Sequence, residues 1–129
     1  MGFKKPNDDG RISWTEHSTY KMQQYGLSAQ RVRRVLKNPK RKEEGIIPGT
    51  VAVMQIANPT AKHHHEIWVM YAVKEETKGK ELIKKKFAKL LRPTRHIRII
   101  TCWRYPGVSP VRQPPPIPED ILREIHLLL

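Results

Sequence analysis

The segment that most constrains the fold runs from residue 17 to residue 39 and reads HSTYKMQQYGLSAQRVRRVLKNP. Gly26 suits the left-handed C-terminal cap of a first helix, and Ser28 suits the N-cap of a second. The closing Asn-Pro ends the second helix, because proline disfavours helical backbone in the residue before it. The segment therefore predicts two short helices, over about 16–25 and 29–37, hinged at Gly26.

The start of the first helix has two candidate caps. Ser13 with Glu16 three residues later forms a capping box, whereas Thr15 stands directly before the helix. Both alternatives are open at this point. The polar, turn-rich residues 1–12 are expected to be a flexible lead-in.

Three runs rich in β-branched and aromatic residues follow the helices: TVAVMQIA at 50–57, IWVMYAV at 67–73 and IRIITCWRY at 97–105. A polar turn joins the first two, so we expect an antiparallel hairpin. The second run is apolar at consecutive positions, which is typical of a central strand buried on both faces. A fourth strand near 40–47 is expected, because three strands barely make a stable layer.

The remaining segments are a lysine-rich insertion at 75–95 and a proline-rich tail at 106–129. Helical spacing of apolar residues predicts a basic amphipathic helix over 80–91, which would face RNA phosphates, or else a membrane surface or partner. In the tail, an extended stretch leads to a helix that begins at Pro118. The prediction is one α+β domain over 13–105: two N-terminal helices, then a small, mostly antiparallel sheet of about four strands, with the insertion and the C-terminal helix added.

Charge narrows the class of partner. Lys and Arg number 25 against 12 Asp and Glu, a formal net charge of +13. Solubility needs only about 2–8 charges in a small domain, so the excess favours a polyanion, and nucleic acid is the commonest. No apolar run approaches the roughly 18 residues of a membrane span, and the N-terminus lacks a signal-peptide core. The single cysteine, Cys102, excludes an internal disulfide, so we expect a cytoplasmic protein.

The run HSTYKMQQYGLS at 17–28, with IITCWRY at 99–105, resembles a family of small bacterial and phage domains with the signature H-S/A-x-x-R/K-M-x-x-R/Y-G-I/L-S. That family is grouped with the barnase–EndoU–colicin–RelE superfamily of metal-independent endoribonucleases, many of them toxins. The resemblance covers about residues 14–105. It implies a RelE/barnase-like fold, RNA of the ribosome, mRNA or tRNA as partner, no cofactor, and an antitoxin or other protein partner. The lysine-rich insertion and the tail lie outside the pattern.

Metal-free cleavage of RNA requires a base for the 2′-hydroxyl, an acid for the leaving 5′-oxygen, and cations for the developing charge. His17 and Lys21 lie four residues apart, hence on one face of the first helix. The ordinary histidine pKa of about 6.5 suits either proton role. Arg104 and Tyr105 complete the predicted catalytic set, because related folds draw Arg or Tyr from a late strand. The alternative is that His17 only packs or caps the helix and that Lys21 is solvated.

Other basic and aromatic residues are predicted to bind RNA. Strict alternation along the last strand would place Ile99, Thr101 and Trp103 on one face. Trp103 would stack an unpaired base, worth about 1–3 kcal/mol, although an aromatic residue in a strand is more often a core residue. Arg41 would reach a phosphate, unless its basic run is only a solvated corner. The predicted RNA-binding residues are Arg31, Arg34, Arg41, Lys84, Lys85, Arg98, Thr101 and Trp103.

Metal chemistry is not expected. The adjacent histidines at 63–65 point in different directions, and there is no second ligand cluster with the spacing of a structural zinc site. Cys102 is expected to be a small buried hydrophobe. Three hypotheses result: a metal-independent endoribonuclease; a non-catalytic RNA- or ribosome-binding module with the same fold; and a toxin relative whose C-terminal helix binds a partner or its own cleft.

Overall fold

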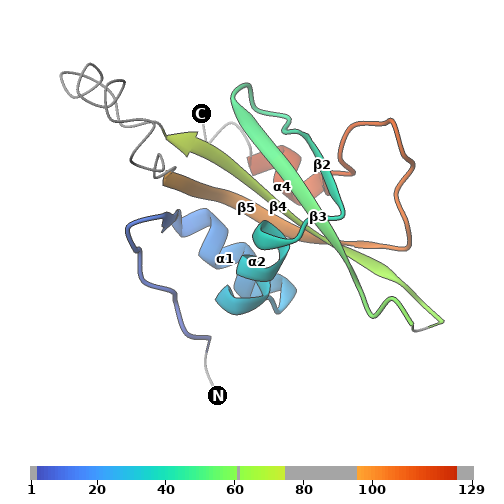
Figure 1. The fold of residues 1–129 in the computed structure, drawn as a ribbon, viewed down its shortest axis with the longest axis horizontal. Helices are drawn as coiled ribbons and strands as arrows, with labels where there is room; N and C mark the ends of the chain where they lie inside the picture. The colour runs from blue at the N-terminus through green and yellow to red at the C-terminus, as the bar shows by residue number, and fades with distance from the viewer. Residues whose placement is uncertain (1–2, 61, 75–95, 125–129) are drawn as a thin grey trace, which may run out of the picture.

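The protein is described by a computed structural model that covers residues 3–60, 62–74 and 96–124. Its centre is a five-stranded sheet of order β1-β5-β4-β3-β2 (Figure 1). The strands are β1 (Ile12–Trp14), β2 (Arg41–Glu44), β3 (Thr50–Ala57), β4 (His65–Lys74) and β5 (His96–Pro106). The helices are α1 (Glu16–Tyr25), α2 (Ala29–Lys37) and α4 (Glu119–Glu124).

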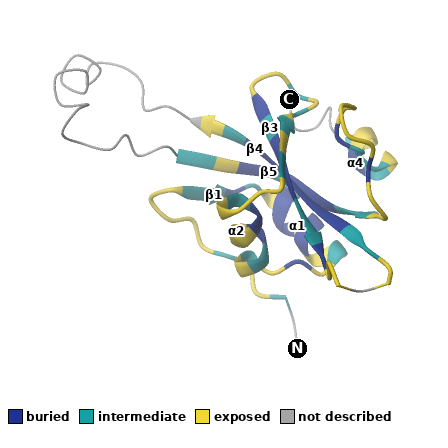
Figure 2. Cartoon of the chain, turned by 45° about the vertical axis from the view of Figure 1, so that its right-hand side comes forward, coloured by how far each residue is buried: buried dark blue, intermediate teal, exposed yellow. Residues whose placement is uncertain are grey.

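Helices flank the sheet on both sides (Figure 2). On the side of α1 and α2, one apolar cluster is centred on Met22, Val32 and Val69. On the side of α4, a second cluster holds Trp103 and Ile121 among its members. The central strand β4 contributes fully buried residues to both clusters, which confirms that it is covered on both faces.

Local capping sets the two N-terminal helices, as predicted. Thr15 is the N-cap of α1, and its hydroxyl accepts from the backbone N–H of Ser18, whereas Ser13 lies in β1. Gly26 adopts φ 65°, the left-handed conformation, and closes α1 with a Schellman motif. Ser28 caps α2. The helix pair hinged at Gly26 is therefore confirmed, with Thr15 as the first cap.

The fold is α+β, but its sheet departs from the prediction. A short strand, β1, precedes the helices and pairs in parallel with β5, so the sheet is mixed and has five strands rather than about four. Carboxylates set up this strand, because Asp9 accepts from the backbone N–H groups of Arg11 and Ile12, and Asp8 accepts from that of Trp14. Three residues are too few for their alternation to signal a strand, which is why the prediction missed it.

A β-bulge changes the faces of β5. Met70 of β4 pairs with Thr101, but the next residue, Tyr71, pairs with Ile99, so Ile100 is the extra residue. Ile99 consequently packs with the α1 and α2 cluster, whereas Trp103 packs with the α4 cluster. The predicted sharing of one face by these two residues is wrong, because alternation is interrupted at Ile100.

The remaining strands follow the prediction. β3 and β4 form an antiparallel hairpin, and β2 pairs antiparallel with β3 as the expected fourth strand. The basic helix predicted over 80–91 lies outside the described residues. In the part of the chain that is described, no helix is long and apolar enough to cross a membrane.

Candidate functional site

The side chain of Lys21, one half of the predicted catalytic pair, is buried against α4. It is only 1% exposed, and its Nζ lies 2.7 Å from Asp120 Oδ2 and 3.2 Å from Glu124 Oε2. Gln24 Oε1 accepts a third hydrogen bond at 3.0 Å. Burial alone would lower the pKa of Lys21, but hydrogen bonds and charge from the two carboxylates outweigh it and raise this pKa. Lys21 is therefore a charged and fully neutralised ammonium.

His17 belongs to the same cluster. Its Nε2 lies 3.1 Å from Thr101 Oγ1, and its Nδ1 lies 3.4 Å from Glu124 Oε2. Burial lowers the pKa of His17, against the opposing charge of Glu124, which favours the neutral ring. Nε2 therefore forms a hydrogen bond with the Thr101 hydroxyl, whereas Nδ1 faces a carboxylate oxygen at ion-pair distance. Both ring nitrogens thus have a polar neighbour, and Nε2 has a hydrogen bond.

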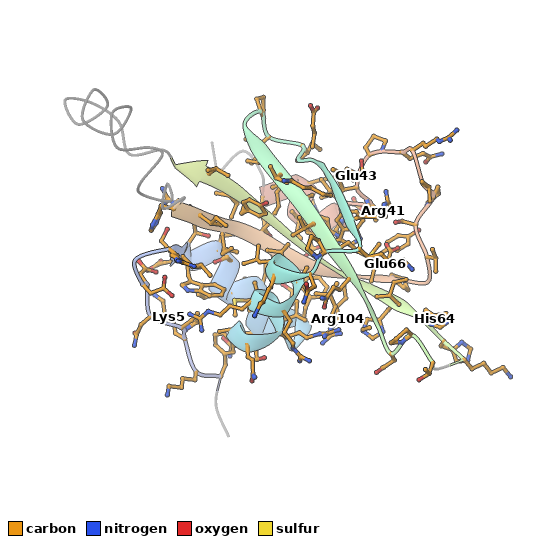
Figure 3. The ribbon with its side chains drawn as sticks, viewed as in Figure 1. Lys5, Arg41, Glu43, His64, Glu66 and Arg104 are labelled. Carbon is orange, nitrogen blue, oxygen red and sulfur yellow. The ribbon has the colours of Figure 1, made fainter. Side chains whose placement is uncertain are left out.

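The other two predicted catalytic residues lie elsewhere. Arg104 points to the side of α1 and α2, beside the end of α1 and apart from Arg41 and Glu43 (Figure 3). Its Nε donates to the Tyr25 carbonyl at 2.6 Å, and its Nη2 donates to the Gly26 carbonyl at 3.2 Å. Tyr105 is half-buried against the α4 cluster. The structure therefore joins His17 to Lys21 but does not join either to Arg104.

Arg104 lines a separate cavity of about 630 Å³ between α2, the β3–β4 turn and β5. Two further predicted residues, Arg31 and Arg34, line it from α2. His65, at the start of β4, accepts a hydrogen bond of 2.6 Å at Nε2 from Arg104 Nη1. We call this cavity the arginine pocket. Its walls are completed by Gly26, Ser28, Ile56, Ala57, Asn58, Pro59, Thr60 and Ile67.

The arginine pocket concentrates positive charge without a counter-charge. None of its lining residues is acidic, and no ion pair among the described residues reaches Arg31, Arg34 or Arg104. Burial, followed by the charges of Arg34 and Arg104, lowers the pKa of Arg31. Burial, followed by the charges of Arg104 and Arg31, also lowers the pKa of His65. The cations in this cavity repel one another, and a bound anion would reduce that repulsion.

The remaining predicted RNA-binding residues divide by exposure. Thr101 and Trp103 are fully buried, and Trp103 stacks on Trp68 at 5.9 Å between ring centroids, so neither offers a face to a base. Arg41 turns inward, donating to Ser109 Oγ at 2.6 Å and lying 5.1 Å above the Trp68 ring. Arg98 is exposed on β5. The other two residues of the set, at 84 and 85, lie outside the described residues.

Sequence reasoning missed the acidic partners of Lys21 and the role of His65. Asp120 and Glu124 lie four residues apart, so both are on one face of α4. This spacing could have predicted an acidic helix face. His65 was considered only as a metal ligand. Within the described segments, no group of three His, Cys, Asp or Glu residues is placed to hold a metal ion. Cys102 is fully buried, as predicted.

Comparisons of the chain with models of protein families, with curated proteins and with solved structures find no match. The family resemblance drawn from residues 17–28 and 99–105 is thus an expectation.

Proposed function

We propose that this protein binds RNA through its backbone phosphates, and that the arginine pocket is the contact site. The observation that carries the proposal is the grouping of Arg31, Arg34 and Arg104 in one open cavity that no carboxylate lines. A guanidinium presents a planar fork of donors that matches two phosphate oxygens, so arginine suits this ligand better than lysine does.

The three guanidinium groups are unequal in their freedom. Arg104 is held by three neutral acceptors: the carbonyls of Tyr25 and Gly26, and the His65 ring. Those carbonyls belong to the negative end of α1, which offsets part of its charge. Arg31 and Arg34 lie three residues apart on one face of α2 and are the two cations available to bind phosphate. Arg104 would then act as a fixed charge at the base of the pocket.

An RNA chain fits the whole molecule better than a small anion does. The net charge of +13 far exceeds what one phosphate would neutralise. The pocket is open and about 630 Å³, which is larger than one phosphate group needs. The resemblance to RNA-cleaving domains points the same way.

Binding is better supported than cleavage. A general base needs a free lone pair to take the proton of a 2′-hydroxyl. His65 Nε2 accepts from Arg104, whereas His17 has Thr101 Oγ1 at Nε2 and Glu124 Oε2 at 3.4 Å from Nδ1. Lys21 is 1% exposed and already paired. The second candidate function, a metal-independent endoribonuclease, therefore requires His17 to separate from Thr101 and Glu124.

The test is a titration of single-stranded RNA of about 12 nucleotides, followed by fluorescence anisotropy in EDTA. We expect the Arg31→Gln/Arg34→Gln variant to lose about tenfold or more in affinity, the equivalent of two weakened phosphate contacts. The matched control, Lys5→Gln/Lys42→Gln, removes two exposed cations that do not line the pocket and should lose threefold at most.

Equal losses in the two variants would show that the charge acts diffusely and would refute the pocket as the site. The same samples, run on a denaturing gel, test the second candidate. Intact RNA supports a binding module, whereas products with 2′,3′-cyclic phosphate ends that vanish in His17→Ala would establish the endoribonuclease instead.

A further inference from the structure

We call the group formed by Lys21, His17, Tyr25, Asp120 and Glu124 the Lys21 cluster. It has the composition of an anion-binding site that is already occupied. An ammonium, an imidazole nitrogen and the Tyr25 hydroxyl converge on two carboxylates, and Tyr25 Oη lies 3.4 Å from both oxygens of Asp120. These donors are the kinds that bind a phosphate. Here the anions are carboxylates of the same chain, and Asp120 lies 99 residues after Lys21 in the sequence.

The carboxylates are supplied by α4, the last described element of the chain. The described part of α4 runs from Glu119 to Glu124. It is anchored by Ile121, which is fully buried, and by its two carboxylates. The segment before it contains a turn at 111–112, and its residues from 110 to 114 are exposed. The apolar cluster that holds α1 and α2 on the sheet includes no residue of α4, whereas the cluster on the other face includes Ile121.

The cluster and the arginine pocket meet at a shared residue. The backbone carbonyl of Tyr25 accepts from Arg104, while its hydroxyl reaches Asp120. The two cationic sites consequently lie on either side of the C-terminal end of α1.

We propose that α4 is an internal competitor of RNA. Asp120 and Glu124 occupy a second phosphate-binding site, formed by Lys21, His17 and Tyr25, and RNA displaces them. The inference rests on the proposed function, since the arriving ligand is RNA. It adds that full engagement of RNA requires release of α4, and that the exposed lysine and histidine then contact backbone phosphate.

Affinity tests this competition. Asp120→Asn/Glu124→Gln weakens the internal ligand and keeps the Ile121 anchor. Apparent affinity is reduced by the fraction of protein in which α4 is released, and the variant should raise that fraction. We therefore expect RNA to bind this variant about tenfold more tightly. The control Glu44→Gln/Glu119→Gln changes net charge equally at two exposed positions and should gain twofold at most. Tryptophan fluorescence checks that both variants are folded.

Release of α4 is measured directly with a spin label. Cys102 is buried and its pKa is raised to about 12, so a thiol reagent would label only the exposed position in Arg123→Cys. We expect the oligonucleotide used above to convert an immobilised electron paramagnetic resonance spectrum into a mobile one, with the same midpoint as binding.

The outcomes separate the two proposals. RNA that binds while the label stays immobile, or Asp120→Asn/Glu124→Gln that binds no better than its control, overturns the competition and leaves the arginine pocket standing. RNA that binds no form of the protein overturns the proposed function, and this inference with it.

Discussion

Replacement of Lys21 by methionine isolates the bond between α1 and α4. Methionine keeps most of the aliphatic stem and removes the charge, so Asp120 and Glu124 face each other without a cation. Breaking a fully buried pair costs about 3–5 kcal/mol, and an exposed pair is worth about 0.2–1 kcal/mol. Lys21 is 1% exposed, but the carboxylate side chains are 29% and 33% exposed and regain water. We therefore expect Lys21→Met to lose about 2 kcal/mol of unfolding free energy.

Asp120→Asn should cost less, about 1 kcal/mol, because Lys21 keeps Glu124 at 3.2 Å. The double variant should lose less than the sum of the two, with a coupling energy of about 1 kcal/mol. Urea denaturation followed by tryptophan fluorescence measures all four proteins, and the buried Trp14, Trp68 and Trp103 supply the signal.

Glu119→Gln, an exposed acid of the same helix, is the matched control and should couple to Lys21→Met by no more than about 0.3 kcal/mol. A coupling energy that small for Asp120 as well would refute the reasoning, since α4 would then be held by Ile121 alone.

Three further predictions concern the cluster and the core. The pKa of His17 is lowered on folding. Its contribution to stability is therefore complete above the unfolded pKa of about 6.5 and is lost as pH falls through the lower, folded pKa. In His17→Gln, the unfolding free energy measured against pH should be flatter on that acid side. Trp103→Ala should cost about 3–5 kcal/mol in urea denaturation, because it empties a fully buried site stacked on Trp68, and a loss under 1 kcal/mol would contradict this packing. Gly26→Ala should cost about 1–2 kcal/mol, because alanine is strained at φ 65°, and an unchanged melting temperature would argue against the left-handed cap.

Local signals explain how much of the fold was predictable. Gly26 and Ser28 announce the helix pair through capping chemistry that acts over a few residues. The hairpin of β3 and β4 follows from hydrophobic runs with a polar turn between them. By contrast, β1 exists only through its parallel pairing with β5, and the bulge at Ile100 is a register choice made between strands. Neither leaves a periodic pattern in the sequence.

The two clusters show the same division. Spacing placed His17 and Lys21 on one face of α1, and the structure brings them together. It could not show that Asp120, 99 residues away, neutralises Lys21, because that contact depends on where the C-terminal segment crosses the sheet. Nor could alternation show that Arg104 points toward α2, where it meets Arg31 rather than His17.

The measurement that tests the central claim most directly is the salt dependence of RNA binding. For single-stranded RNA, the logarithm of the binding constant falls with the logarithm of salt concentration by about 0.7 for each phosphate neutralised. Arg31→Gln/Arg34→Gln should therefore reduce this slope by about 1.4, whereas Lys5→Gln/Lys42→Gln should leave it unchanged within about 0.3. Equal slopes for the arginine variant and the unmodified protein would contradict the claim that the arginine pocket binds phosphate.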